Sequence, residues 1–192
     1  MDLIAYILNR YHLLIMKTLN PVNVTLWKLG LGRLFNLWPA VFGRHMVVKH
    51  YDHKNGTPIY TPIHYLESDS MIYFAINQGV NSEWVQNIIS NPQVEVWLPD
   101  GWYAGQADVI ELPDDRLALL RNILSDKMIS ARMARIEPEM DDQDFELAVE
   151  DYVLIRVNRQ SPRTGVDGPG GLAWLWPFIL MFLLGLRPRK RR

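Results

Sequence analysis

The chain has 192 residues, with 20 lysines and arginines against 21 aspartates and glutamates, and a formal net charge of −1. This length suits one domain with a full hydrophobic core and some added segments. The balanced charge gives no electrostatic basis for binding nucleic acid. The absence of cysteine excludes disulfides, thiolate nucleophiles and cysteine-based metal centres.

The first 44 residues favour helices. Apolar residues recur at helical spacing through residues 2–19, and Pro21 is expected to end that amphipathic helix. Asn23 is expected to cap a second helix over residues 23–35. Charged residues interrupt the apolar N-terminal run, which makes it a poor secretory signal, so we expect this segment to be retained.

From His45 the hydrophobic period changes to that of β-strands. Turn chemistry separates the runs, and only two helices interrupt them, one around Trp84 and one opening at Pro113. Strands joined by hairpins predict an α+β fold, mainly β, with a split antiparallel β-barrel of about six strands over residues 45–160. The six expected strands contain HMVVKHY, IYTPIHYL, MIYFAIN, QVEVWL, WYAGQADVIEL and YVLIRV.

Familiar catalytic motifs are absent. The chain has no G-x-S-x-G, no phosphate-binding P-loop and no H-E-x-x-H, so a hydrolase has little support. His50 and His53 could hold a metal together with His64, but no carboxylate pattern completes such a set. Half-exposed strand histidines are the simpler interpretation, and no metal site is predicted.

The turn DHKNG has two interpretations. Asn55 and Gly56 suit the positive φ angles of a type I′ hairpin turn, which requires only a fold. His53 and Lys54 place cationic donors beside backbone N–H groups, which suits a phosphate or carboxylate. Pro62, within the next strand, indicates a sheet edge, a bulge or a contact with something other than a strand.

This turn, His53-Lys54-Asn55-Gly56, is followed in order by three motifs: Thr61-Pro62-Ile63, Asn77-Gln78-Gly79-Val80, and a helix from Trp84 through Asn87 to Asn91-Pro92. In order and spacing they resemble the deazaflavin-dependent nitroreductase family, a branch of the split-barrel flavin reductases that also includes pyridoxamine-phosphate-oxidase-like proteins. The resemblance is close from His45 to about Val96. Ile59 stands where that family has an arginine.

The resemblance implies a split barrel that binds coenzyme F-420, an 8-hydroxy-5-deazaflavin, and passes hydride to a quinone, nitro compound or other conjugated lipophilic acceptor. FMN is the alternative cofactor, and a non-catalytic protein that binds a lipid or flavin-type cofactor is the alternative function. No catalytic residue is assigned, although His64, Tyr65 and Tyr73 are candidate proton donors. The implied cofactor-binding residues are His53, Lys54, Asn55, Gly56, Thr61, Pro62, Asn77, Gln78, Gly79, Trp84 and Asn87.

The C-terminus reads as a membrane-associating segment. A Pro/Gly linker over residues 161–171 leads to 15 apolar residues, Leu172 to Leu186, within a final segment 172–192 that ends in a basic tail. A helix of that length spans about 23 Å, which is short for a bilayer core of about 30 Å. We therefore expect it to lie in the interface and bind membrane lipid at the cytoplasmic face; otherwise the protein is cytoplasmic. A homodimer is possible, and the sequence does not decide the oligomeric state.

Overall fold

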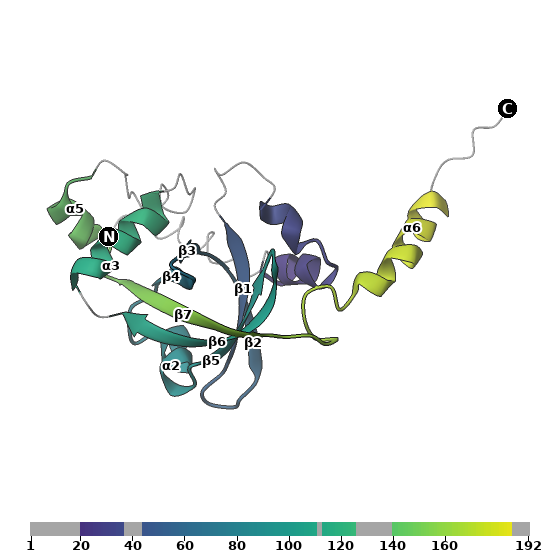
Figure 1. The fold of residues 1–192 in the computed structure, drawn as a ribbon, viewed down its shortest axis with the longest axis horizontal. Helices are drawn as coiled ribbons and strands as arrows, with labels where there is room; N and C mark the ends of the chain where they lie inside the picture. Colours follow the sequence, from purple (N-terminus) through teal and green to yellow (C-terminus); the bar gives the residue numbers. More distant parts are fainter. Residues whose placement is uncertain (1–19, 37–43, 111–112, 126–139, 186–192) are drawn as a thin grey trace, which may run out of the picture.

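The computed structural model describes residues 20–36, 44–110, 113–125 and 140–185. Its described strands form one seven-stranded antiparallel sheet with the order β2-β1-β5-β6-β7-β4-β3 (Figure 1). The strands are β1 (His45–Tyr51), β2 (Pro58–His64), β3 (Leu66–Ser68), β4 (Met71–Asn77), β5 (Gln93–Leu98), β6 (Gly101–Ile110) and β7 (Tyr152–Pro162). Besides a helix over residues 20–28, the described helices are η1 (Gly32–Asn36), α2 (Glu83–Ser90), α3 (Pro113–Ser125), α5 (Asp142–Ala148), η3 (Ala173–Leu175) and α6 (Trp176–Gly185).

The sheet curls so that its two edges meet. β2 and β3 are the edge strands, yet Tyr65 alone separates them in the chain. Two edges joined by one residue can belong to one sheet only if that sheet bends round into a half-barrel. The expected α+β fold with an antiparallel sheet is confirmed. The run IYTPIHYL, expected as a single strand, divides at Tyr65 into β2 and the start of β3, which accounts for seven strands rather than six.

The main core lies inside the curl, with α2 packed into it. Ser82 caps this helix by accepting a hydrogen bond from Val85 N at 3.4 Å, and Asn91 ends it, as expected from the Asn91-Pro92 motif. Alternation along the strands directs one set of side chains inward. This core contains, among others, Met46, Val48, Phe74, Val85, Ile88, Val96, Ile155 and Val157.

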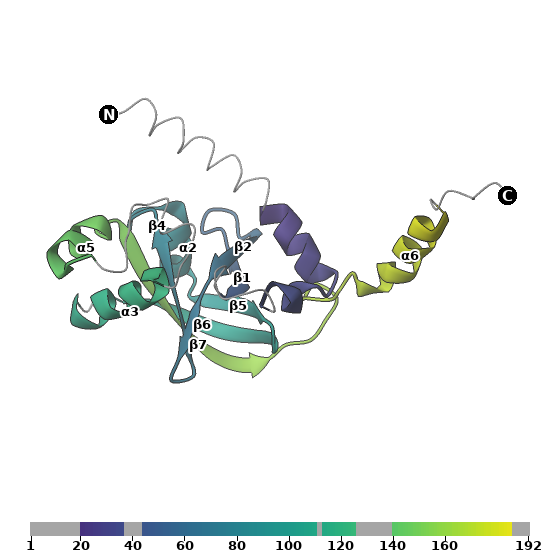
Figure 2. The ribbon, with the colours of Figure 1, turned by 90° about the horizontal axis from the view of Figure 1, so that it is seen from above.

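Helices cover the outside of the sheet at its two ends. At one end α3 and α5 pack on β7, with Leu120, Phe145 and Leu154 fully or almost fully buried. At the other end a helix over residues 20–28 places Trp27 against the sheet (Figure 2). Because this helix includes residues 20–23, Pro21 does not end a helix and Asn23 does not cap one. Proline removes only an N–H, and the Pro21 carbonyl still accepts from Thr25 Oγ1 at 2.7 Å.

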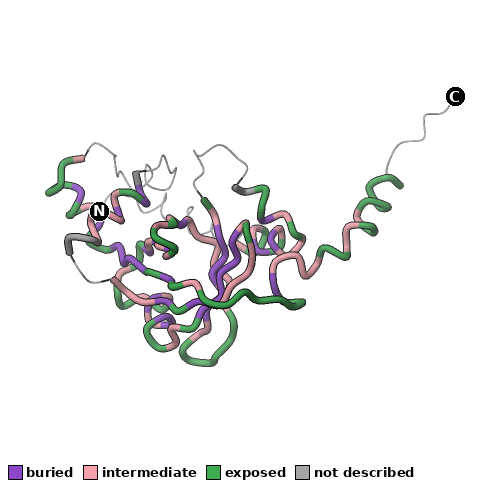
Figure 3. The backbone as a smooth tube through the Cα atoms, in the orientation of Figure 1, coloured by how far each residue is buried: buried purple, intermediate pink, exposed green. Residues whose placement is uncertain are grey.

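The C-terminal part first follows the body and then leaves it. β7 continues to Pro162, five residues beyond the expected strand, and the segment 163–172 folds back on the helix over 20–28. α6 then projects away with most of its surface exposed (Figure 3). None of the helices described is long and apolar enough to cross a membrane. The basic residues 187–192 and the expected helix over 2–19 lie outside the described residues.

Candidate functional site

A pocket of about 230 Å³ lies where the β1–β2 hairpin meets α2 and the loop before it. Strand β1 supplies His50, the hairpin loop supplies Asp52 and His53, and α2 supplies its first turns. Four of the sequence-predicted cofactor residues line it, with four that sequence reasoning missed. The lining residues are His53, Gln78, Trp84 and Asn87, and then His50, Asp52, Ile59 and Glu83.

The loop that carries the lysine turn is held by its own side chains. Asp52 Oδ1 accepts from Lys54 N at 2.7 Å, and Asn55 Oδ1 accepts from Thr57 N at 2.9 Å. Gly56 has φ of 70°, whereas Asn55 is not among the residues with positive φ. The expected type I′ turn at Asn55-Gly56 is therefore wrong. The six residues 52–57 form a wider loop because side chains satisfy its backbone donors.

Asn87 fixes this loop against α2. Its side-chain Oδ1 accepts from the backbone N–H of His53 at 2.9 Å and lies 2.6 Å from His53 Nδ1. Because a carbonyl oxygen only accepts, the His53 ring carries a proton on Nδ1. Both bonds end on Oδ1, so neither uses the amide nitrogen of Asn87, which is almost fully buried beside the pocket.

A chain of polar groups crosses from α2 to β1 through Thr61. Trp84 Nε1 donates to Thr61 Oγ1 at 3.0 Å, and His50 Nε2 lies 3.2 Å from the same oxygen. The threonine proton finds an acceptor here only if His50 Nε2 is unprotonated. In that tautomer the His50 proton lies on Nδ1, a buried atom without a hydrogen-bond partner within the described residues.

His50 is neutral at physiological pH. Its side chain is fully buried and its ring centroid lies 4.7 Å from that of Trp84. Burial lowers its pKa from 6.5 to about 4, although the charge of Asp52 acts in the opposite direction. The pocket wall therefore contains a neutral imidazole, and in the tautomer that accepts from Thr61 its Nδ1–H is unsatisfied. Such a group costs folding free energy unless an acceptor meets it.

Lys54, the expected anion-binding lysine, is paired. Its Nζ donates to Glu83 Oε1, and both side chains are largely exposed. The hydrogen bond to Glu83 raises the pKa of Lys54, and the same bond lowers the pKa of Glu83. An exposed pair of this kind is held weakly, so an anion could compete with Glu83 for the lysine.

The remaining predicted residues are not among those that line the pocket. Pro62 lies in β2, at the edge of the sheet, which is one of the alternatives that its strand position indicated. Asn77 ends β4. Gly79, with φ of 70°, donates its N–H to Asp151 O at 2.9 Å and so fixes the loop after β4.

The three candidate proton donors are not among the pocket-lining residues. His64 pairs across the hairpin with His45, ring centroids 3.8 Å apart, and burial lowers its pKa to about 3. Tyr65 lies at the corner between β2 and β3, and burial raises its pKa. Tyr73 packs on the outer cluster with α3. Within the described ranges no three histidines or carboxylates are grouped for a metal ion.

Comparison with protein families places the chain in a known family. The model of the F420H2-dependent quinone reductases matches residues 37–139, more than half of the chain. The chain belongs to this family. The relationship to deazaflavin-dependent reductases predicted from the sequence is thus confirmed, and coenzyme F-420 is the cofactor that family membership supports over FMN.

Solved structures with similar folds share little sequence with this F420H2-dependent quinone reductase family member. A putative pyridoxamine 5′-phosphate oxidase from Listeria innocua has 15% identity and a TM-score of 0.46, over 62% of this chain and 86% of that one. An F420-H2 dependent reductase, FDR-A, has 15% identity and a TM-score of 0.43, over 59% of this chain and 93% of that one. No curated protein matches the chain in sequence.

Proposed function

We propose that this reductase binds coenzyme F-420 with part of the coenzyme in the His50–Asn87 pocket and passes its hydride to a lipophilic quinone at a membrane surface. The family match supports the coenzyme, and the unpartnered Nδ1 of His50 in the pocket wall is the structural observation that carries the proposal. At about 230 Å³ the pocket is smaller than the roughly 300–1,000 Å³ of whole-ligand sites, so it suits one portion of a large coenzyme.

The donors present fit a deazaflavin. Its ring system carries carbonyl oxygens that accept hydrogen bonds, and the wall offers His50 Nδ1–H and the amide nitrogen of Asn87. Its tail carries phosphate and carboxylate groups, for which Lys54 stands at the rim. When bound in reduced form, the coenzyme supplies the hydride. The chain's residues hold the ring, shield it from water and fix the approach of the acceptor.

The acceptor and the location are inferred from the described C-terminal helix. Its apolar side chains are mostly more than half exposed. Exposure of this apolar surface to water is unfavourable in free energy. Burial in the lipid interface removes this surface from water and brings the protein to where lipophilic quinones are dissolved. Reduction of a quinone to a quinol takes the hydride and one proton. No described side chain is assigned to donate that proton.

Two substitutions at the exposed ion pair test the placement of the coenzyme tail. Lys54→Ala should weaken F-420 binding several-fold, because a cation at the rim is lost. Glu83→Gln should strengthen it several-fold, because the lysine is released from its partner. Fluorescence titration with oxidised F-420 measures both. If both variants bind as the unmodified protein does, the tail does not lie at this rim.

A substitution in the wall tests the ring position. His50→Phe keeps an aromatic side chain but removes the N–H, so a ligand oxygen would lose its donor. We expect the F-420 dissociation constant to rise about tenfold. His64→Phe is the matched control, since it removes a half-buried histidine that does not line the pocket. Equal affinity in the two variants would contradict the proposed site, and binding of a lipid without any reductase turnover would favour a non-catalytic function.

A further inference from the structure

A second, larger pocket lies outside the candidate site and shares no lining residue with it. Its volume is about 390 Å³. It is bounded by the end of the helix over 20–28 and η1, by the β5–β6 turn, and by the segment 163–170. Two tryptophans, two arginines and five glycines dominate its lining: Trp27, Trp102, Arg33, Arg163, Gly30, Gly32, Gly101, Gly165 and Gly170.

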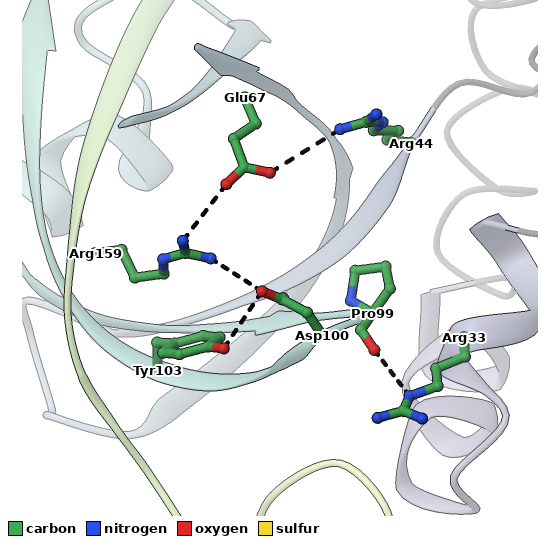
Figure 4. A network of polar contacts seen from close by, with 7 residues as sticks. All are labelled: Arg33, Arg44, Glu67, Pro99, Asp100, Tyr103 and Arg159. Atoms are coloured by element: carbon green, nitrogen blue, oxygen red, sulfur yellow. Dashed lines mark hydrogen bonds and ion pairs between the residues drawn. The ribbon is translucent and has the colours of Figure 1, made fainter. Parts of the chain in front are cut away.

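The charged residues of this pocket are both cationic. Arg33 donates from Nε to Pro99 O at 2.9 Å, which anchors the guanidinium beside the β5–β6 turn. No hydrogen bond from its two terminal nitrogens is found within the described part of the chain. The neighbouring carboxylate of Asp100 does not neutralise it, because Asp100 accepts from Arg159 at 3.1 Å and Tyr103 at 3.3 Å (Figure 4).

Arg163 is also fixed in place. Its backbone N–H donates to Trp102 O at 2.7 Å, and its guanidinium donates to the buried Glu95 at 3.0 Å. Glu95 is further neutralised by Lys49 at 3.2 Å, so the cluster of these three charged groups keeps one excess positive charge. Together with Arg33, the pocket presents a net cationic lining to an anion.

The walls between the arginines are aromatic and glycine-rich. Trp27 is almost fully buried, and its Nε1 has no hydrogen-bond partner within the described residues. Gly170, with φ of 80°, has no atom within 4 Å of where a Cβ would lie, so its backbone faces open space. Cationic donors together with aromatic walls in one pocket suit a phosphate group attached to an apolar body.

The pocket lies where the exposed helix leaves the body. The segment that forms its wall is tied to the helix over 20–28 by Gly170 N to Trp27 O at 3.0 Å and by Leu172 N to Lys28 O at 2.8 Å. Trp176, the first residue of α6, donates to Leu29 O at 2.9 Å. Figures 1 and 2 show α6 departing from this corner. If α6 lies in a lipid interface, the headgroups reach this pocket.

We propose that this second pocket binds the phosphate headgroup of an anionic phospholipid, with Arg33 and Arg163 as its cationic ligands. The inference rests on the membrane location in the proposed function. The same phosphate chemistry could come from free phosphate, but the tryptophan walls and the adjoining apolar helix favour a phosphodiester that carries acyl chains.

The first test is flotation with vesicles of phosphatidylcholine alone and of phosphatidylcholine mixed with phosphatidylglycerol. Arg33→Gln should weaken binding to the mixed vesicles about fivefold and leave binding to the neutral vesicles unchanged. Arg156→Gln is the matched control, because Arg156 on β7 is paired with Asp108 on β6 and does not line the pocket. Both variants keep residues 187–192, so attraction by that tail is common to them. Equal loss in the two variants would overturn the proposal.

A second test does not depend on α6. Short-chain phosphatidylglycerol, below its micelle concentration, should shift the indole N–H resonances of the pocket tryptophans, and Arg33→Gln should remove the shift. If this occurs although no vesicle is bound, the pocket is supported and the membrane location fails. If inorganic phosphate gives the same shift at the same concentration, or neither compound gives one, the lipid-headgroup proposal is overturned.

Discussion

Lowering the pH from about 7 to about 5 is expected to reduce the free energy of unfolding by about 4 kcal/mol. Burial lowers the pKa of His50 from 6.5 to about 4 and that of His64 to about 3. Between these values and 6.5 the unfolded chain binds two protons that the folded protein excludes, so stability falls as the pH falls. Each histidine contributes about 2 kcal/mol over this interval. Urea unfolding at the two pH values measures the difference.

The variant His64→Phe separates the two contributions. It should halve the loss of stability between the two pH values, whatever its effect on stability at neutral pH, since only the His50 titration remains. The comparison of each variant with itself at two pH values removes the packing change from the result. A pH dependence as steep as that of the unmodified protein would show that His64 is not held neutral by burial.

The hydrophobic pattern predicted most of the strands, but it did not predict how far β7 extends or where the chain turns from β2 into β3. YVLIRV reads as a strand because Val153, Ile155 and Val157 enter the inner core while Tyr152 and Leu154 face the outer cluster. Its continuation to Pro162 has mostly exposed side chains and is held by pairing with β6, which leaves no apolar pattern to read. The corner at Tyr65 is set by a long-range bond from its N–H to Arg44 O.

The hydrophobic pattern does not predict helix α5, because this helix is marked by an N-terminal capping residue and not by a row of apolar residues at helical spacing. The run around Asp141 is acidic, yet Asp141 accepts from Asp144 N at 2.8 Å and starts a seven-residue helix. Its one fully apolar anchor, Phe145, packs under the guanidinium of Arg121 and against α3. A helix this short depends on such tertiary contacts, which local sequence does not specify.

The order of the motifs predicted several residues of the candidate site, but it did not predict which side chains would contact each other in the folded protein. His53, Gln78, Trp84 and Asn87 come from three separate motifs and line one pocket. The interpretation of His50 as a half-exposed strand histidine is wrong, because the side chain is fully buried. The strand period does place it on the same face as Met46 and Val48, which are in the core. The partner of Lys54 lies 29 residues away on α2, and only the folded hairpin brings the two together.

Replacing Met181 and Phe182 with aspartate is expected to reduce vesicle binding by more than a hundredfold. Each side chain buried in lipid contributes about 1.5–3 kcal/mol, and a charge at the same position opposes insertion. Both side chains are about two-thirds exposed, so the fold should keep its stability. Leu147→Asp on α5 is the matched control, because Leu147 is equally exposed but lies on another surface. Flotation and urea unfolding measure the two effects.

The same double variant tests whether helix α6 contributes to the reduction of a quinone in the membrane. With a long-chain quinone dissolved in vesicles, its rate of F-420 oxidation should fall with vesicle binding, whereas the rate with a water-soluble quinone should stay unchanged, because α6 lines neither pocket. Loss of a dimer with unchanged vesicle binding would instead show that a second copy of the chain covers α6. Equal rates with both quinones would separate the helix from catalysis and leave the membrane location without a role in choosing the acceptor.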